Sequence, residues 1–355
     1  MKIVLSVPTL NHNGAERVVS ILANSFVQMD HEVEILLYYD VPIWYDLDSK
    51  VKVVISRREE PRGDLLHQLQ WRRRYIKQAS PDVVFSFLAP NNMMNIVNFF
   101  GLKTTLIVAD RNDPRRVPVR GVQRLLRNIL YNFAHGVVLQ SENNLKYFSR
   151  IVQRKGTVIF NPVNLGENLG VALQCEKKKK IVSVGRLIRQ KNPLMLLDAF
   201  HMIYEAFPDY TLTYYGEGDY MERIREQAIR YGISDKVLLP GPQKNIPDHI
   251  MDAEIFAMTS EYEGMPNALL EAMGLGLAVV CTKVSGAIDI IEDHANGILV
   301  ECGNASQLAE ALTFYLTNKE SRQSCAENAV DVVADLKNDK ISRQWLDFAK
   351  SIQKR

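Results

Sequence analysis

Cysteine is scarce in this chain of 355 residues, and the four cysteines form no C-x-x-C pair. They are Cys175, Cys281, Cys302 and Cys325. Their wide spacing fits neither a zinc motif nor the dense cysteine pattern of a disulfide scaffold. We therefore expect reduced thiols, as in a cytosolic protein.

Long hydrophobic runs are also lacking. The apolar run at the N-terminus ends at Pro8, which is too short for the core of a signal peptide, and no stretch reaches about 18 uninterrupted apolar residues. The sequence predicts neither export nor a membrane span, so that any contact with a bilayer would be peripheral.

Net charge is small, because 43 Lys and Arg stand against 41 Asp and Glu, a formal charge of +2. The two signs are nevertheless unevenly distributed. Residues 1–180 contain 26 basic against 16 acidic residues, whereas residues 181–355 contain 17 against 25. This asymmetry indicates that the basic half meets an anionic partner. The length and the 46% hydrophobic content predict a globular protein of two domains.

Short apolar segments alternate with segments of helical periodicity along the chain. The strands expected in the first half are Lys2–Val7, Val33–Leu37, Val51–Ile55, Val83–Phe87, Thr105–Val108 and Gly136–Leu139. After the charged run Lys177–Lys180 the pattern restarts, with strands expected at 180–185, Tyr210–Tyr215, Val237–Leu239, Val279–Cys281 and Gly297–Val300. Strands that are apolar on both faces and alternate with helices predict an α/β fold of two doubly wound parallel sheets.

The sharpest motif is E-Y-E-G-M-P-N-A-L-L-E-A-M at 261–273. Pro266 and the helix-forming residues after it predict a helix that begins near residue 266, whose free N–H groups could bind phosphate. Glu263 precedes this helix and Glu271 lies one to two turns inside it, so the two carboxylates could reach opposite ends of an elongated ligand. The alternative is that Glu263 is merely a loop residue and Glu271 a solvated helix residue, which is the more common outcome for an isolated pair of glutamates.

A second cluster, G-R-L-I-R-Q-K-N-P at 185–193, follows the first strand of the second domain. Arg186 could chelate phosphate oxygens and Lys191 could add a point charge, which would stabilise a departing diphosphate without a metal ion. A basic surface loop is the alternative.

These two clusters, with N-G-A-E-R at 13–17 after the first strand, resemble the retaining glycosyltransferases of family 4. The motifs S-F-L at 86–88, D-R-N-D-P at 110–114, F-N-P-V at 160–163 and N-G-I-L-V at 296–300 follow in the order of that family. Within it, the chain looks similar to bacterial transferases that build lipid-linked oligosaccharides, capsule or O-antigen, including the N-acetylgalactosamine transferases of protein N-glycosylation.

The resemblance implies a GT-B fold, in which two Rossmann-like domains face each other across a cleft. It implies an N-terminal acceptor domain at 1–165, a C-terminal donor domain at 178–335 and a last helix at 336–355 that packs back on the first domain. It also implies transfer of a sugar from a UDP-sugar to a polyprenyl-diphosphate-linked glycan, with retention and with no metal or other cofactor. The protein would then be cytoplasmic and peripheral on the inner face of the cell membrane.

Residue roles follow from the same resemblance. The catalytic residues would be Glu263, which binds the donor sugar, and Arg186 and Lys191, which bind its diphosphate. The other donor-binding residues would be Gly14, Gly216, Gly241, Gln243, Gly264, Met265, Pro266, Asn267, Ala268, Leu269 and Glu271. The acceptor-binding residues would be Asn91, Asp110, Arg111, Arg115 and Arg116.

This chain departs from the family pattern at two places. Relatives often carry paired glycines where this sequence has Asn13-Gly14, and several carry a histidine near the acceptor, which the segment 86–91 lacks. Only His12 lies in a suitable loop, and a single loop histidine is more often solvated than catalytic. No general base is therefore assigned.

Arginines concentrate in the first half, notably around a predicted helix between Val119 and Phe133. Its apolar stripe consists of Val122, Leu125, Leu126, Ile129, Leu130 and Phe133. Such a basic amphipathic helix could lie on an anionic bilayer or bind a diphosphate-linked lipid. The alternative, equally open, is a helix whose apolar face packs on the core. No nucleic-acid module is present, so nucleic acid is not expected as a partner.

Two other functions remain open, namely a nucleotide-sugar 2-epimerase and a non-catalytic module that binds a sugar nucleotide. A nicotinamide dehydrogenase is disfavoured, because the first turn, Pro8–Gly14, contains no G-x-G-x-x-G and Gly216-Glu217-Gly218 lacks the third glycine.

Overall fold

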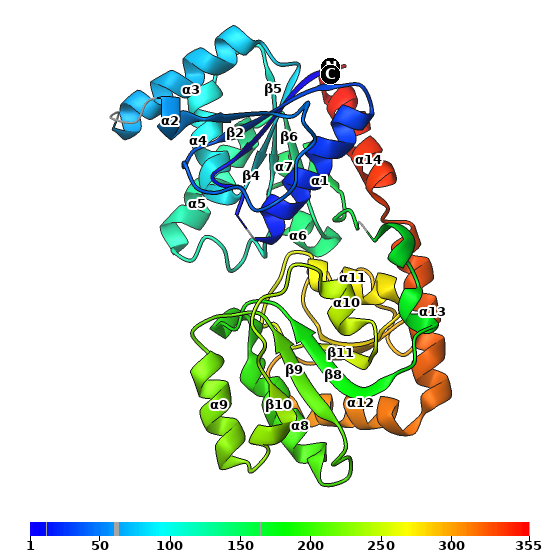
Figure 1. The fold of residues 1–355 in the computed structure, drawn as a ribbon. Coiled ribbons are helices and arrows are strands. Elements are labelled where there is room, and N and C mark those ends of the chain that lie inside the picture. Colours follow the sequence, from blue (N-terminus) through cyan, green and yellow to red (C-terminus); the bar gives the residue numbers. More distant parts are fainter. Residues whose placement is uncertain (12, 60–63, 164, 355) are drawn as a thin grey trace. The chain divides into compact units, whose positions relative to one another are not determined.

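The structure is a computed structural model that describes residues 1–11, 13–59, 64–163 and 165–354. It divides into two compact units (Figure 1). Unit 1 comprises residues 1–162 together with 337–355, and unit 2 comprises residues 163–336.

Unit 1 contains a parallel sheet with the strand order β3-β2-β1-β4-β5-β6-β7. Its strands are β1 (Lys2–Val7), β2 (Glu32–Leu37), β3 (Lys52–Ile55), β4 (Val83–Phe87), β5 (Thr105–Ala109), β6 (Gly136–Leu139) and β7 (Gly156–Val158). Its helices are α1 (Gly14–Gln28), α2 (Ser56–Glu59), α3 (Leu65–Ala79), α4 (Ala89–Phe99), α5 (Gly121–Leu130), the 3-10 turn η1 (Tyr131–Phe133), α6 (Glu142–Tyr147), α7 (Arg150–Lys155) and α14 (Asn338–Gln353).

Consecutive residues of the central strands β1 and β4 are buried. Because successive side chains of a strand point to opposite sides, both faces of this sheet are covered. On one face, Val4 of β1 and Val84 of β4 pack with Ile76 of α3 and Ile96 of α4. This face holds the layer that includes α3 and α4.

The last helix of the chain belongs to the other face of this sheet. There α14 lies beside α1 (Figure 1). Its Trp345 is fully buried, and the indole lies 5.2 Å from the ring of Phe85 and 5.5 Å from that of Phe87. The C-terminal residues therefore complete the core of unit 1.

Unit 2 contains a second parallel sheet with the order β10-β9-β8-β11-β12-β13. Its strands are β8 (Lys178–Val184), β9 (Thr211–Tyr215), β10 (Val237–Leu238), β11 (Ala253–Met258), β12 (Ala278–Thr282) and β13 (Ile298–Val300). Its helices are α8 (Pro193–Tyr204), α9 (Met221–Arg230), α10 (Ile246–Ile250), α11 (Asn267–Leu275), α12 (Ala305–Thr317) and α13 (Lys319–Ala334), and 3-10 turns occur at Gly166–Asn168, Val171–Leu173, Arg189–Lys191 and Ser234–Lys236.

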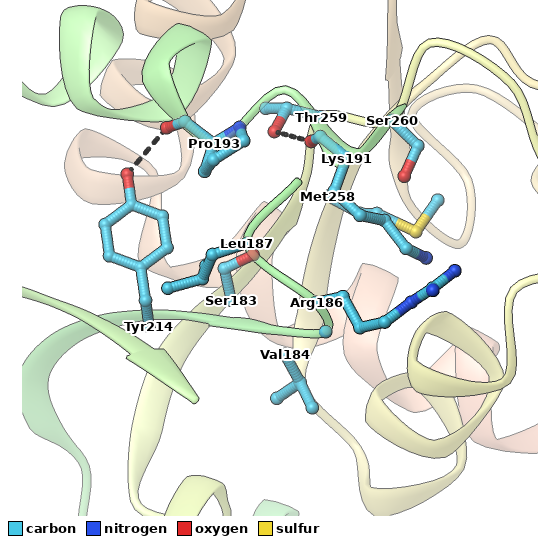
Figure 2. A pocket seen from close by; sticks show the side chains of 11 residues that line it. Ser183, Val184, Arg186, Leu187, Lys191, Pro193, Tyr214, Met258, Thr259 and Ser260 are labelled. Carbon is cyan, nitrogen blue, oxygen red and sulfur yellow. Dashed lines mark hydrogen bonds between the residues drawn. The ribbon is translucent and has the colours of Figure 1, made fainter. Parts of the chain in front are cut away.

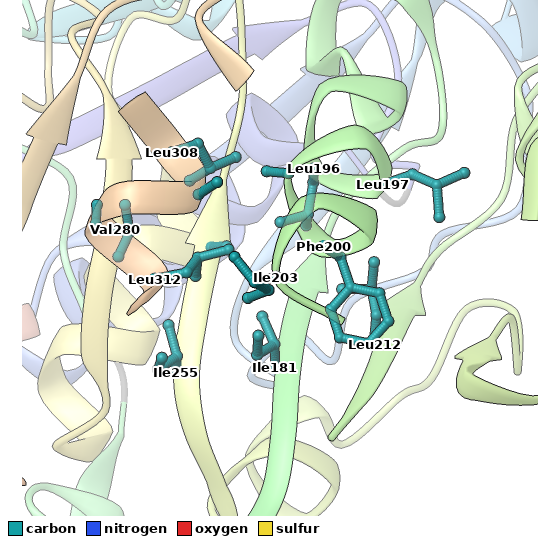
Figure 3. Packing of buried hydrophobic residues seen from close by; sticks show 14 of the residues in the cluster. Ile181, Leu196, Leu197, Phe200, Ile203, Leu212, Ile255, Val280, Leu308 and Leu312 are labelled. Carbon is teal, nitrogen blue, oxygen red and sulfur yellow. The ribbon is translucent and has the colours of Figure 1, made fainter. Parts of the chain in front are cut away.

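The core of unit 2 lies between its sheet and the adjacent helices α8 and α12 (Figure 3). Leu196 and Phe200 of α8 and Leu312 of α12 meet Ile181 of β8 and Ile255 of β11 there. These side chains are fully buried, so this layer fixes the positions of the central strands.

The predicted fold class of two doubly wound parallel sheets is confirmed. Two strands were not predicted, β7 and the central strand β11. The sequence of β11, A-E-I-F-A-M, is rich in helix-forming residues. Burial of Ile255 and Phe256 between two other strands outweighs that preference.

The unit boundary also differs from the predicted one at residue 165. The backbone N–H of Val163 donates to the carbonyl of Leu336 at 2.9 Å, and both residues belong to unit 2. Residue 163 and residues 165–177 therefore belong to the second unit rather than the first.

Candidate active site

The candidate site lies where the strand order of the second sheet reverses. From β8 the chain proceeds to β9 on one side, whereas β11, the other neighbour of β8, leads to β12 on the opposite side. Ligands of open α/β sheets bind beyond the carboxyl ends of strands at such a point. The loop after β8 (Gly185–Asn192) and the loop after β11 (Thr259–Pro266) meet there.

Hydrogen bonds join these two loops. Thr259 donates its hydroxyl to the carbonyls of Lys191 at 3.0 Å and Asn192 at 2.9 Å. The side-chain amide of Gln190 donates to the carbonyl of Tyr262 at 2.9 Å, and the N–H of Glu261 donates to the carbonyl of Gln190 at 2.8 Å. The two loops thus form one connected frame for the site.

That frame brings together Lys191 and Glu263, which are 72 residues apart in the sequence. The ammonium of Lys191 lies 2.5 Å from Oε1 of Glu263. Both side chains are mostly buried, with 24% and 12% of their surfaces exposed. Glu263 is thus a loop residue, but its carboxylate is mostly buried and paired with a cation rather than solvated.

Arg186 lies on the same loop and is exposed. It lines a pocket together with Lys191, Thr259 and Ser260, and in Figure 2 the side chains of Arg186 and Lys191 extend in the same direction from their loop. Tyr214 and Pro193 also line this pocket, and the hydroxyl of Tyr214 donates to the carbonyl of Pro193 at 2.9 Å. Two cations are therefore presented at the end of β8.

The helix expected near residue 266 is α11, and it begins at Asn267 with Pro266 at its N-cap. Glu271 lies in its second turn with only 6% of its surface exposed, so it is not a solvated helix residue. Of the residues at the helix start, Gly264, Met265, Pro266 and Leu269 are buried, whereas Asn267 and Ala268 are partly exposed. The backbone around Gly264 is close-packed, because a Cβ on Gly286 would lie 2.2 Å from the Gly264 carbonyl oxygen.

Position 216 requires a glycine, because the backbone of Gly185 leaves no room for a side chain there. The φ of Gly216 is +150°, and a Cβ there would lie 2.0 Å from the carbonyl oxygen of Gly185. Its N–H donates to the carbonyl of Gly241 at 3.1 Å. Gln243 donates to the carbonyl of Pro240 at 3.3 Å. Of these predicted donor-binding residues, Gly216 lies directly against the Arg186 loop, and Gly241 is hydrogen-bonded to Gly216.

Sequence reasoning missed Gln190 and Thr259, whose side chains join the loops, and Ser260, which lines the pocket. The last two directly follow β11, which was not predicted, so no strand end drew attention to them. Gln190 lies within the predicted cluster, but its role depends on a partner 72 residues away.

In unit 1, the predicted donor-binding residue Gly14 is exposed and is the first residue of α1. Glu16, in the first turn of this helix, is buried and accepts hydrogen bonds from Thr9 at 3.0 Å and Asn13 at 3.2 Å. The loop before α1 is thereby anchored to its helix. His12 lies outside the described residues.

Three of the five predicted acceptor-binding residues are buried. Asn91 is fully buried and donates to the carbonyl of Ser6 at 2.9 Å. Asp110 is 2% exposed and lies 3.5 Å from the guanidinium of Arg127, and burial raises the pKa of its carboxyl to about 6. Arg111 is 9% exposed, donates to Asn161, and has its pKa lowered by burial to about 9. Asn91 and Asp110 thus hold the carboxyl ends of the strands, and the described conformation does not expose them to an acceptor.

Arg115 and Arg116 are exposed. Arg115 donates to the side chain of Asn143 at 3.0 Å and lies 5.4 Å from the ring centre of Tyr147. Of the predicted acceptor-binding residues, these two present charge to the surface of unit 1.

The described residues contain no group of three or more His, Cys, Asp or Glu side chains placed to hold an ion. The cations at the site are side chains, and all four cysteines are free thiols.

Comparison with known proteins shows that this chain is similar to glycosyltransferases. Residues 169–332 match the family described as glycosyl transferases group 1. Over 363 residues, covering 99% of both chains, the sequence is 28% identical to a GalNAc-α-(1→4)-GalNAc-α-(1→3)-diNAcBac-PP-undecaprenol α-1,4-N-acetyl-D-galactosaminyltransferase of Campylobacter jejuni. A second enzyme of that organism, N-acetylgalactosamine-N,N'-diacetylbacillosaminyl-diphospho-undecaprenol 4-α-N-acetylgalactosaminyltransferase, is 27% identical over 98% of this chain and 99% of its own.

Among solved structures, Anabaena HepE in complex with UDP and glucose shares the fold with a TM-score of 0.82 at 20% identity. The match covers 99% of this chain and 100% of that one.

Proposed function

We propose that this chain, a glycosyltransferase of GT-B architecture whose residues 169–332 form a glycosyl transferases group 1 domain, transfers a hexose or N-acetylhexosamine from a UDP-sugar to a glycan on polyprenyl diphosphate. One observation carries this proposal, the ion pair of Lys191 with Glu263 beside Arg186 at the reversal point of the second sheet. The names of both Campylobacter relatives, which specify undecaprenyl-diphosphate glycans, support the acceptor class.

In the proposed site, four side chains bind different parts of the UDP-sugar donor. Arg186 and Lys191 bind the diphosphate, Glu263 the sugar hydroxyls and Glu271 the ribose. Lys191 then neutralises the diphosphate while it also holds Glu263 in place, because its Nζ lies 2.5 Å from that carboxylate. Two side-chain cations supply the charge stabilisation that a leaving diphosphate needs.

In the proposed reaction, the bond between the anomeric carbon and the diphosphate oxygen breaks, and its electron pair remains on the phosphate. The acceptor hydroxyl oxygen then bonds to the anomeric carbon on the same face, and its proton passes to the leaving phosphate oxygen. The products are UDP and a glycan longer by one sugar with retained configuration. This route needs no protein base, so that positioning and charge stabilisation perform the catalysis.

The distribution of charge supports a peripheral site of action at the inner face of the cell membrane. Unit 1 contains 28 Lys and Arg against 16 Asp and Glu, whereas unit 2 contains 15 against 25. An excess of basic residues attracts both an anionic lipid surface and the diphosphate of the acceptor. No helix in the described part of the chain is both long and apolar enough to cross a bilayer.

The experiment that tests this function incubates the protein with a panel of labelled UDP-sugars and a polyprenyl-diphosphate-linked glycan. Transfer of label to the lipid-linked product, with linkage analysis, supports the proposal. Conversion of the UDP-sugar without an acceptor would indicate an epimerase, and binding without turnover would indicate a non-catalytic module.

Metal independence is tested in the same assay by adding EDTA. Because Arg186 and Lys191 supply the positive charge, we expect the rate to stay within about twofold, a change of less than about 0.5 kcal/mol in the barrier. Strict dependence on Mg²⁺ or Mn²⁺ would contradict the proposed role of the two cations.

A further inference from the structure

The helix α5 is oriented opposite to an ordinary surface helix. Its stripe of apolar residues faces outward, with exposed fractions of 79% for Val122, 63% for Leu125 and 50% for Ile129. Phe133, one turn further along the same stripe, is 58% exposed. Leu130 of the predicted stripe packs against the core, but its other five side chains are exposed, so the alternative in which the whole apolar face packs on the core is wrong.

A buried arginine fixes this orientation. Arg127 is fully buried on the inward side of α5. Its guanidinium donates to the carbonyl of Val117 at 2.5 Å and to that of Pro114 at 2.8 Å, and it lies 3.5 Å from the carboxylate of Asp110. Rotating the apolar stripe inward would expose these acceptors and leave a buried carboxylate unpaired, at a cost of several kcal/mol. The contacts of Arg127 therefore hold α5 with its apolar face turned outward.

Further exposed apolar side chains occur just before α5 and on the adjacent helix. Val119, just before α5, is 79% exposed, and on the neighbouring helix α4 and at its C-terminal end, Val97 and Phe100 are 62% and 67% exposed. Two exposed arginines, Arg116 and Arg120, flank Val119 in the sequence. Exposed apolar surface bordered by cations is the pattern of a helix that lies in the interface of an anionic bilayer.

We propose that the outer α5 surface, defined as Val119, Val122, Leu125, Leu126, Ile129 and Phe133, inserts into the headgroup and upper acyl region of an anionic membrane. The inference rests on the proposed function, because a polyprenyl-linked acceptor is held in that membrane. A second copy of the chain is the less suitable occupant. Unit 1 carries a formal charge of +12, so two such faces would repel each other, whereas anionic lipids attract it.

The test uses the full-length protein and sedimentation with vesicles of phosphatidylcholine and phosphatidylglycerol. The variant Leu125→Gln with Ile129→Gln keeps good helix formers at both positions and should lower the partition coefficient by about tenfold or more. The matched control, Met202→Gln with Ile229→Gln, replaces two comparably exposed apolar residues of unit 2 and should bind as the wild type does.

A second measurement reports insertion directly. In a Leu125→Trp variant, brominated lipids should quench the added fluorescence, and in a Met202→Trp control they should not. Unchanged partition of the double Gln variant, or a wild-type dimer that this variant abolishes while vesicle binding stays intact, would overturn the proposal.

Activity separates this inference from the proposed function. With a water-soluble, short-chain acceptor, the double Gln variant should transfer sugar at the wild-type rate, and with a long-chain acceptor in vesicles its rate should fall. Absence of transfer by the wild type in both formats would refute the function. Equal rates of the variant and the wild type in vesicles would refute membrane insertion alone.

Discussion

At the scale of single residues, the ion pair between Lys191 and Glu263 is the decisive contact, because it joins the two clusters to which we assign the proposed donor chemistry. The variant Glu263→Gln keeps the size of the side chain and removes its charge. We expect the transfer rate to fall by about 100-fold or more, since a donor contact that strengthens in the transition state is lost. The measurement is the steady-state rate with the best UDP-sugar.

The control for this variant is Glu261→Gln, two residues earlier in the same loop, where the side chain is exposed. It should retain nearly full activity. A Glu263→Gln enzyme with near-normal turnover would remove Glu263 from the site.

Arg186 offers a second test of the donor site. Arg186→Ala removes an exposed guanidinium without disturbing the core, so we expect a loss of about 100-fold or more in transfer with a small change in melting temperature. Arg189→Ala, an exposed arginine of the same loop, is the matched control. Equal effects of the two substitutions would indicate that general loop charge, rather than Arg186 itself, binds the diphosphate.

Gly216 is expected to be intolerant of any side chain. In Gly216→Ala the new Cβ would lie 2.0 Å from the carbonyl oxygen of Gly185, so the loop that carries Arg186 must shift. We expect a loss of about 1–3 kcal/mol in urea unfolding and weaker UDP binding by calorimetry. Gly232→Ala also has a positive φ, +69°, but nothing lies within 4 Å of its Cβ, so it should lose stability through backbone strain alone and bind UDP normally.

At the scale of elements, the edge of the first sheet contains a charge cluster that links β1, β2, β3 and α3. Glu34 is buried, accepts a hydrogen bond from Tyr75 at 2.5 Å and lies 3.1 Å from Lys52 and 3.6 Å from Lys2. Burial raises the pKa of Glu34, but the hydrogen bonds of Tyr75 and Lys52 and the charge of Lys2 together lower it below the usual 4.5.

This shift predicts a pH dependence of stability. Because the folded-state pKa is depressed, the stabilising effect of Glu34 is fully present above about pH 5 and is lost as the pH falls through the lowered pKa. Glu34→Gln should therefore flatten the acid limb of the unfolding free energy of unit 1, measured by urea titration between pH 3 and 6. An unchanged acid limb in this variant would contradict the assigned shift.

Two elements show where sequence patterns succeed and where they do not. The sequence predicted the helix α5, because its apolar residues recur at helical spacing. It did not predict which face of this helix would be buried. That choice depends on Arg127, whose partners Asp110, Pro114 and Val117 lie at least ten residues away. The strand β11 was missed because its burial comes from β8 and β12, not from its own propensity.

At the scale of the whole molecule, unit 1 depends on both ends of the chain. A protein that stops at residue 336 lacks α14 and with it the buried Trp345. Loss of this indole alone is worth about 3–5 kcal/mol, so we expect unit 1 to melt early or not to fold, while unit 2 keeps its transition. Differential scanning calorimetry of the full and shortened chains measures this.

The same calorimetry locates the nucleotide. UDP at about 100 times its dissociation constant should stabilise the transition of unit 2 by about 2.7 kcal/mol and leave that of unit 1 unchanged. The shortened chain should show the same shift of its unit 2 transition. A shift confined to the transition of unit 1 would show that UDP binds unit 1, which would contradict the proposed donor site in unit 2.

The sequence by itself determined the alternation of strands and helices and the existence of two α/β domains, and it singled out the charged motifs of the proposed donor site, because apolar periodicity and short charged motifs are local properties of the chain. The tertiary structure decided which of these residues meet. Lys191 reaches Glu263 because β8 and β11 are neighbours, Asn91 and Asp110 are buried because strand ends converge on them, and α5 turns its apolar face outward because a buried arginine holds the opposite face. Each of these outcomes depends on contacts between residues far apart in the sequence, and such contacts leave no local pattern from which they could be read.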